Sequence, residues 1–184
     1  MTNNYYLRAA SLFLTFLTIT LTVMTTSLAF ATATLPPCFD GSVTLAPIND
    51  QVLAWKTSTP NQFRRRALVQ GTIDQIFPDH AGHHHFEIKI GSKDTDILEV
   101  IYNEDFGPVP ALKVGSTVEA CGDYITSIAQ SGPYPPSPSG GIIHWVHKSP
   151  NLATHPSGFL AIDGVVCGQD VGSAGPKLPH YSAQ

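Results

Sequence analysis

Alternating apolar and polar positions mark a series of strands from Ala67 onward. The segments are ALVQGTIDQIF, HHFEIKIG, DILEVIY, STVEACGDYI and GIIHWVH, each rich in Ile, Val, Phe or Tyr, and Pro, Gly and Asp lie between them. β-Branched and aromatic residues favour strands, and the separating residues favour turns. Five strands at this spacing predict a small closed barrel. Gly71, inside the first strand, fits the tight bend that such a barrel needs.

Further elements flank these strands. Before them, apolar residues at spacings of four and three predict one amphipathic helix over Pro47–Lys56. After them, the apolar runs FLAI and VVC enclose Asp163-Gly164, which is a strong signal for a hairpin turn. Between the fourth and fifth strands, the segment 131–141 is rich in proline and predicts an extended surface loop.

The order strand, bend, strand, strand, short connection, strand, loop, strand resembles the oligonucleotide/oligosaccharide-binding (OB) barrel. We therefore expect a mainly β fold: a small five-stranded OB-like Greek-key barrel with a short N-terminal helix and a C-terminal hairpin. SH3-like barrels and jelly-roll fragments are alternatives with similar strand spacing. A fold of this kind does not determine function.

The first 33 residues differ from the rest of the chain. They contain no Gly, Pro or acidic residue and a single basic residue, Arg8, which is followed by an apolar, Thr-rich run that ends in Ala29-Phe30-Ala31-Thr32-Ala33. This composition is typical of a secretory signal peptide cleaved after Ala31 or Ala33. A retained transmembrane anchor is the alternative, because the apolar run is longer than most signal-peptide cores.

This interpretation divides the chain into four parts and predicts a secreted or periplasmic protein. The parts are a signal peptide (1–33), an N-terminal extension with the short helix (34–66), the OB-like barrel (67–168) and a flexible tail (169–184). Without the first 33 residues the net charge is near −5. An acidic balance argues against a nucleic-acid partner, and no membrane contact is expected after cleavage.

The cysteine count is odd. Cys38, Cys121 and Cys167 are the three cysteines, and in a secreted chain they predict one disulfide and one free thiol. The sequence leaves all three pairings open.

Histidine is the most informative residue type, because six of the eight histidines lie in the two segments DHAGHHHFEI and HWVH. Strand alternation places His84 on the core face of the second strand, and His83 and His85 together on the opposite face. In a regular fifth strand, His144 and His147 would lie on opposite faces.

If the second and fifth strands meet at the barrel mouth, a set of metal-ligating side chains converges there. The candidate ligands are His83, His85, His144, His147, His155 and Asp79. Neutral imidazole and carboxylate suit a divalent metal such as Zn. Glu87 shares the face of His83 and His85, where its usual role is a surface charge. The alternative is that these histidines are solvated or hydrogen-bonded to the backbone.

Four segments resemble a bacterial family of secreted proteins known as domain of unknown function 3465: GTIDQIFPDHAGHHHF, VPALKVGSTVEACGDY, GGIIHWVH and HPSGFLAIDG. The resemblance spans about Ala67 to Gly168. It implies a small extracytoplasmic barrel, and it brings no established activity, so it assigns no catalytic residue.

Three classes of function follow. The first is a ligand-binding barrel for a small ligand or a glycan, because Trp145 lies beside His144 and His147, and an aromatic ring in a groove stacks on a sugar or base. The second is a metal-dependent hydrolase of the phosphoesterase or nuclease type, in which a metal held by the histidines activates water. The third is a structural or interaction protein without a small ligand.

Overall fold

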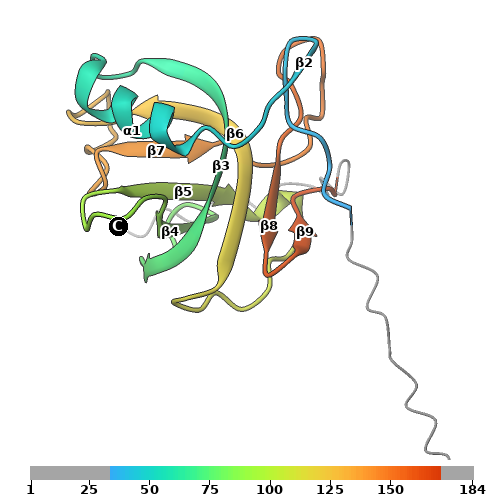
Figure 1. The fold of residues 1–184 in the computed structure, drawn as a ribbon. Coiled ribbons are helices and arrows are strands. Elements are labelled where there is room, and N and C mark those ends of the chain that lie inside the picture. Colours follow the sequence, from blue (N-terminus) through green and yellow to red (C-terminus); the bar gives the residue numbers. More distant parts are fainter. Residues whose placement is uncertain (1–33, 171–184) are drawn as a thin grey trace, which may run out of the picture. The chain divides into compact units, whose positions relative to one another are not determined.

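The computed structural model describes residues 34–170, whose elements are labelled in Figure 1. In chain order they are β1 (Phe39–Asp40), β2 (Val43–Thr44), α1 (Asn49–Ser58), β3 (Arg64–Ile76), β4 (His83–Lys89), β5 (Ile97–Asn103), the 3-10 helix η1 (Glu104–Phe106), β6 (Thr117–Thr126), β7 (Gly141–His144), β8 (Phe159–Ile162) and β9 (Val165–Cys167). The predicted signal peptide, and the predicted tail apart from its first two residues, lie outside this range. No helix within it is long and apolar enough to cross a membrane.

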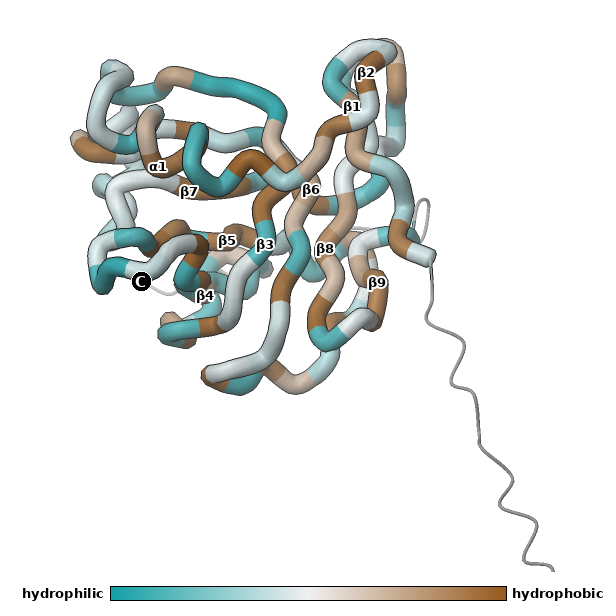
Figure 2. Tube along the Cα trace, viewed as in Figure 1, coloured by the Kyte–Doolittle hydropathy of each residue, from teal (hydrophilic) through white to brown (hydrophobic). Residues whose placement is uncertain are grey.

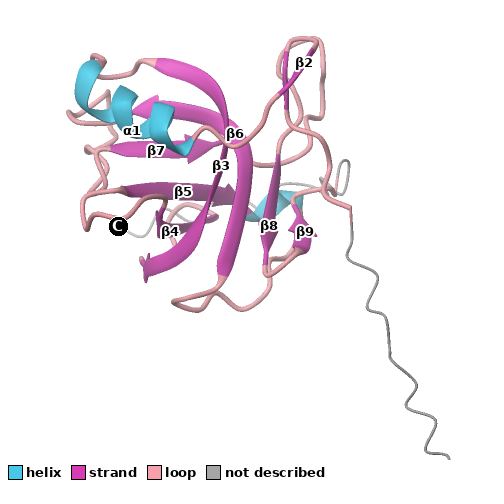
Figure 3. Cartoon of the chain, in the orientation of Figure 1, coloured by secondary structure: helices cyan, strands magenta, loops and turns pink. Residues whose placement is uncertain are grey.

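The five predicted strands close into a barrel. They follow one another in the order β3-β4-β5-β7-β6, and β6 pairs back with β3. All neighbouring pairs are antiparallel except β5 and β7, which are parallel. This closure confirms the predicted OB-like Greek-key barrel. Figure 3 shows that loops and η1 connect the strands, while α1 precedes them.

Strand β3 is long because it belongs to two ladders. Its first part pairs with β6 as far as Thr72, and its second part pairs with β4 from Thr72 to Ile76. Gly71 lies at the changeover, where a Cβ atom would collide with the backbone carbonyl of Lys89. Glycine therefore permits the close approach of β4 at the point where the sheet bends.

The core fills the barrel and continues beneath α1. Alternate side chains of the barrel strands are fully buried, among them Phe86, Tyr102 and Tyr124. Helix α1 contributes Val52, which is also fully buried, and the Trp55 ring packs against Tyr124. Figure 2 shows hydrophobic segments recurring along β3, β5 and β8. The predicted helix is confirmed, shifted by two residues toward the C-terminus.

A second, smaller core lies on the face of β3, β6 and β8 opposite the main core, against the N-terminal segment that carries Cys38 and Leu45. Strand β8 pairs with β6 and then with β9, which confirms the hairpin at Asp163-Gly164. Cys38 and Cys121 are joined by a disulfide in this core, while Cys167 is free and buried. The disulfide attaches the β1–β2 hairpin, which the sequence did not predict. A structural disulfide is compatible with an extracellular or periplasmic location.

Candidate functional site

Strand β7 is shorter than predicted because Trp145 interrupts it. Trp145 has a left-handed backbone conformation, with φ 57°, directly after the strand ends at His144. Bulky residues rarely adopt this conformation, which costs about 1–3 kcal/mol and occurs most often at functional sites. The turn ends the strand alternation, so His144 and His147 both lie beside the indole ring, 6.1 and 5.1 Å from it between ring centroids.

Two glycines allow neighbouring backbone to approach this turn closely. The Gly158 N–H donates a hydrogen bond to the carbonyl of His147, at 2.7 Å. A Cβ atom at Gly158 would collide with the carbonyls of Cys121 and Trp145, and one at Gly122 would collide with the carbonyl of His144. The backbone on both sides therefore holds the left-handed turn in place.

Trp145 is part of a column of four rings, which we call the ring stack: Phe106, His147, Trp145 and His155. The centroid distances along it are 3.5, 5.1 and 4.1 Å, and its two outer pairs are nearly parallel. Phe106 comes from η1 and His155 from the loop after β7. The stack thus joins two segments that lie far apart in the sequence.

His155 is fixed by a chain of polar contacts. Its Nε2 atom is 2.8 Å from Asp123 Oδ2, and its Nδ1 atom is 2.8 Å from the Pro156 carbonyl. Both ring nitrogens therefore face hydrogen-bond acceptors. Arg66 donates to the other oxygen of Asp123, at 3.1 Å, and also to the carbonyl of Ser157.

Sequence reasoning missed Arg66 and Asp123. Burial lowers the pKa of Arg66, and the hydrogen bond that Arg66 donates to Asp123 opposes that effect. The two residues face each other only because β3 pairs with β6 in one register, in which Arg66 lies opposite Asp123. The sequence did show a basic residue directly before the first predicted strand and an acidic residue on the fourth. It did not show the pairing register of these two strands, which decides whether the two residues meet.

The histidines of β4 reach the same region. The His83 ring lies 5.8 Å from that of His144 and 6.4 Å from that of His85. His83 Nδ1 donates to the carbonyl of Ala81, at 2.9 Å, and His85 Nδ1 is 2.8 Å from Glu99 Oε1. We call His83, His85, His144, His147 and His155 the histidine cluster. Ring contacts link His83 to His85 and His144, and link Trp145 to His144, His147 and His155. No three of these five histidines have ligand atoms within 4.8 Å of one another, so their role as metal ligands stays a prediction.

The inner members of the histidine cluster are neutral imidazoles. Burial, reinforced by the neighbouring His83 and His147, lowers the pKa of His144 to about 4. Burial also lowers the pKa of His147, against the hydrogen bond to the Lys148 carbonyl. At neutral pH each ring therefore offers one hydrogen-bond donor and one acceptor rather than a positive charge.

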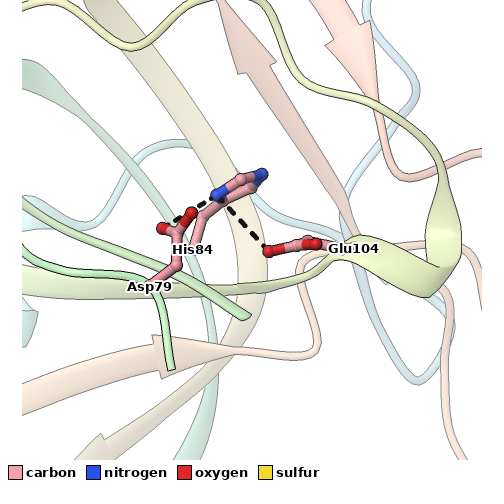
Figure 4. A group of neighbouring side chains, drawn as sticks. All are labelled: Asp79, His84 and Glu104. Atoms are coloured by element: carbon pink, nitrogen blue, oxygen red, sulfur yellow. Dashed lines mark hydrogen bonds and ion pairs between the residues drawn. The ribbon is translucent and has the colours of Figure 1, made fainter. Parts of the chain in front are cut away.

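Asp79 does not join the histidine cluster. It lies beside His84 and Glu104 instead, as Figure 4 shows. Among residues 34–170 these three form the one group of His, Cys, Asp or Glu residues whose ligand atoms all lie within 4.8 Å of one another. The expected convergence of Asp79 with His83 and His85 is therefore wrong, because the β3–β4 loop turns it toward η1.

Glu87 is not the surface charge that the strand pattern predicts. It is 6% exposed, and its Oε2 atom accepts a hydrogen bond of 2.6 Å from the hydroxyl of Ser139. Ser139 belongs to the Pro-rich segment 131–141, which the sequence predicted as an extended surface loop. The end of that loop instead folds back onto the outer face of β4.

The comparisons with known proteins identify a family whose function is unknown. A family model described as "Protein of unknown function (DUF3465)" matches residues 45–168. The matched range contains α1, the whole barrel and the histidine cluster. No curated protein matches the chain.

Proposed function

The chain belongs to the DUF3465 family of proteins of unknown function, and we propose a function from the site itself. We propose that the protein is a ligand-binding barrel for a small, neutral, hydroxyl-rich ligand such as a glycan. The binding surface is Trp145 with the partly exposed members of the histidine cluster, while His147, which is 4% exposed, packs against the indole. We also propose that the protein acts outside the cytoplasm after removal of its N-terminal segment, which the Cys38–Cys121 disulfide supports.

The observation that carries this proposal is the backbone of Trp145. A large aromatic residue is held in a left-handed turn, partly exposed, between His144, His147 and His155. Surrounding packing compensates for the cost of that conformation, and asparagine or glycine would adopt it more easily. A rigid aromatic ring loses little conformational entropy when a ligand binds.

The hydrogen-bonding capacity of the site favours hydroxyl groups over anions. Neutral His144 and His147 have low proton affinity, so they do not attract phosphate. A neutral imidazole pairs instead with hydroxyls, which both donate and accept. The buried cation nearby, Arg66, is already paired with Asp123. These features, with the net charge of −4, support a sugar rather than a nucleic acid.

The two tryptophans of the chain allow a direct test. Trp55→Phe leaves Trp145 as the single fluorescent indole, and Trp55, on α1, packs against Phe63 and Tyr124 of the main core. We expect glycans selected on an array to change the fluorescence of this variant on titration. In the otherwise unchanged chain, Trp145→Gly removes the ring and relieves the backbone, and we expect glycan binding to fall at least about tenfold.

Three results of the same experiment bear against glycan binding at Trp145. A chain that binds no glycan on the array, or that binds equally well after Trp145→Gly, contradicts the proposal. Binding of oligonucleotides in preference to glycans contradicts the choice of ligand class. Circular dichroism of each variant shows whether the barrel is intact.

The metal-dependent hydrolase stays a prediction, and one observation favours it. His83 and His147 each turn Nδ1 toward a backbone carbonyl, which leaves Nε2 as the basic nitrogen. Histidines that bind a metal commonly use this arrangement. Phosphodiesterase assays with added Zn²⁺, repeated on His83→Ala and His144→Ala, test the idea. Activity that both variants retain would exclude the histidine cluster as its source.

A further inference from the structure

We propose that Asp79, His84 and Glu104 form a binding site for a divalent transition-metal ion, with Zn²⁺ as the probe. This site is separate from the histidine cluster, and it does not rest on the proposed glycan binding. His84 Nδ1 lies 3.0 Å from Asp79 Oδ1 and 3.7 Å from Glu104 Oε1, as the dashed lines in Figure 4 show. Two carboxylates from different segments therefore converge on one ring nitrogen.

The backbone fixes the three residues relative to one another. His80 and His83 exchange two backbone hydrogen bonds of 3.0 Å across the turn at Ala81-Gly82, where both residues have positive φ, as in a type I′ turn. This turn follows Asp79 directly. On the other side, the Glu104 N–H donates to the Gly82 carbonyl at 3.0 Å. The β3–β4 loop and η1 are thus joined at the site.

The ring of His84 is also held in place. His84 lies opposite Tyr102 in the β4–β5 ladder, and the two rings are nearly parallel, with centroids 6.2 Å apart. Tyr102 is fully buried and donates to the Gly107 carbonyl. The side chain of His84 is 23% exposed, whereas Asp79 and Glu104 are 55% and 45% exposed. The His84 ring is therefore held at the end of the barrel, and the carboxylates of Asp79 and Glu104 are exposed to solvent beside it.

The spacing of the three ligand atoms suits one small ion. Two ligands at about 2.1 Å from a metal lie about 3.0 Å apart at a right angle and about 3.4 Å apart at the tetrahedral angle. The two measured distances from Nδ1 are close to these values, and the carboxylate oxygens lie within 4.8 Å of each other. Little movement of the side chains is needed to close around an ion.

The charges of the site also call for a cation. Neither carboxylate forms an ion pair with a lysine or arginine in the part of the chain that the structure describes. An ion bound through Nδ1 replaces the proton that this nitrogen now shares with Asp79, and the neutral imidazole keeps its proton on Nε2. With two carboxylates this set carries a net charge of −2 and combines nitrogen with oxygen ligands. Such a set favours Zn²⁺ or a similar transition ion over Mg²⁺ and Ca²⁺, which prefer oxygen alone. Three protein ligands leave positions for water.

Calorimetric titration of Zn²⁺ into the purified full chain, first treated with a chelator, tests the site. We expect one-site binding that weakens at least about tenfold with Asp79→Asn and likewise with Glu104→Gln, because each removes one charged ligand without changing the side-chain volume. Asp105→Asn is the matched control. Asp105 follows Glu104 and is exposed, and its carboxylate lies outside the group, so this change tests charge alone.

His144→Ala separates this site from the histidine cluster. We expect it to leave Zn²⁺ binding unchanged, and crystals soaked in Zn²⁺ to show anomalous density between His84 and the two carboxylates. Absence of Zn²⁺ binding overturns the proposal. It is also overturned if Asp79→Asn and Glu104→Gln bind like the unchanged chain, if Asp105→Asn weakens binding as much as they do, or if His144→Ala alone abolishes binding.

Discussion

The Nε2 atom of His155 lies 2.8 Å from Oδ2 of Asp123, so a residue of a loop is anchored to the middle of a barrel strand. The second oxygen of the same carboxylate accepts from Arg66, whose side chain is 4% exposed. One carboxylate thus contacts both the guanidinium of Arg66 and the imidazole of His155, and it positions the ring that stacks on Trp145.

Asp123→Asn is expected to lower the free energy of unfolding by about 3 kcal/mol, because it leaves the buried guanidinium of Arg66 without its charged partner. The remaining hydrogen bonds of Arg66 go to neutral acceptors: the carbonyls of Phe39 and Ser157 and the sulfur of Cys121. Urea denaturation followed by circular dichroism measures the change. Asp74→Asn, an exposed position on β3, serves as the control and should change stability by less than about 0.5 kcal/mol. Equal effects at the two positions would contradict the assigned role.

Stability is expected to fall as the pH falls from about 6.5 toward 4, because the folded barrel disfavours protonation of His144. Burial is the main cause of the lowered pKa, His83, His147 and Arg64 lower it further, and Asp123 opposes them. The unfolded chain protonates this histidine near its ordinary pKa of 6.5, whereas the folded chain does so near 4. The stabilisation that neutral His144 contributes is therefore complete above the pKa of the unfolded chain, 6.5. It is lost as the pH falls to the pKa of the folded chain, about 4.

The size of this effect is limited by the pKa difference, to about 3 kcal/mol for the single group. Thermal unfolding at pH 7, 5.5 and 4 measures the loss. His144→Gln keeps a polar side chain that does not titrate, so its melting temperature should depend less steeply on pH in this range. The same pH dependence in both proteins would show that His144 is not the group responsible.

Much of the fold was predictable because it depends on local pattern. Alternation along β4 identified the core face that carries Phe86 and Ile88, and the Asp163-Gly164 turn located the C-terminal hairpin. The β1–β2 hairpin has only two residues in each strand, too few for a pattern to form. Its position depends on the Cys38–Cys121 disulfide, and three cysteines leave three pairings open.

The site was less predictable because it depends on departures from the pattern. A regular strand would separate His144 from His147, and only the left-handed turn at Trp145 brings them together. The sequence contains the necessary Gly158, but it does not show which backbone passes beside that residue. Glu87 illustrates the same limit, since its burial depends on Ser139 from a distant loop.

Replacing both Cys38 and Cys121 by alanine is expected to lower the free energy of unfolding by about 2–4 kcal/mol, because the disulfide closes a long loop and so restricts the unfolded chain. The two cysteines are 83 residues apart. Denaturation with and without dithiothreitol measures the effect. Cys167→Ala is the matched control, since Cys167 is buried and free. It should retain the response to the reductant, and the double variant should lose it. A double variant that still responds would contradict this assignment.

Gly158→Ala is expected to cost about 2–3 kcal/mol of stability, because the added methyl group has no room between the carbonyls of Cys121 and Trp145. The displacement should also reach the indole, since Gly158 donates to the carbonyl of His147 next to the turn. Made in the Trp55→Phe background, the substitution can be followed by the emission of Trp145 alone. Gly164→Ala provides the comparison: its φ is 79° but no atom lies within 4 Å, so we expect a cost of about 1 kcal/mol and unchanged emission. If both variants lost equal stability and left the emission of Trp145 unchanged, the close backbone approach at Gly158 would not be what holds Trp145 in its left-handed turn.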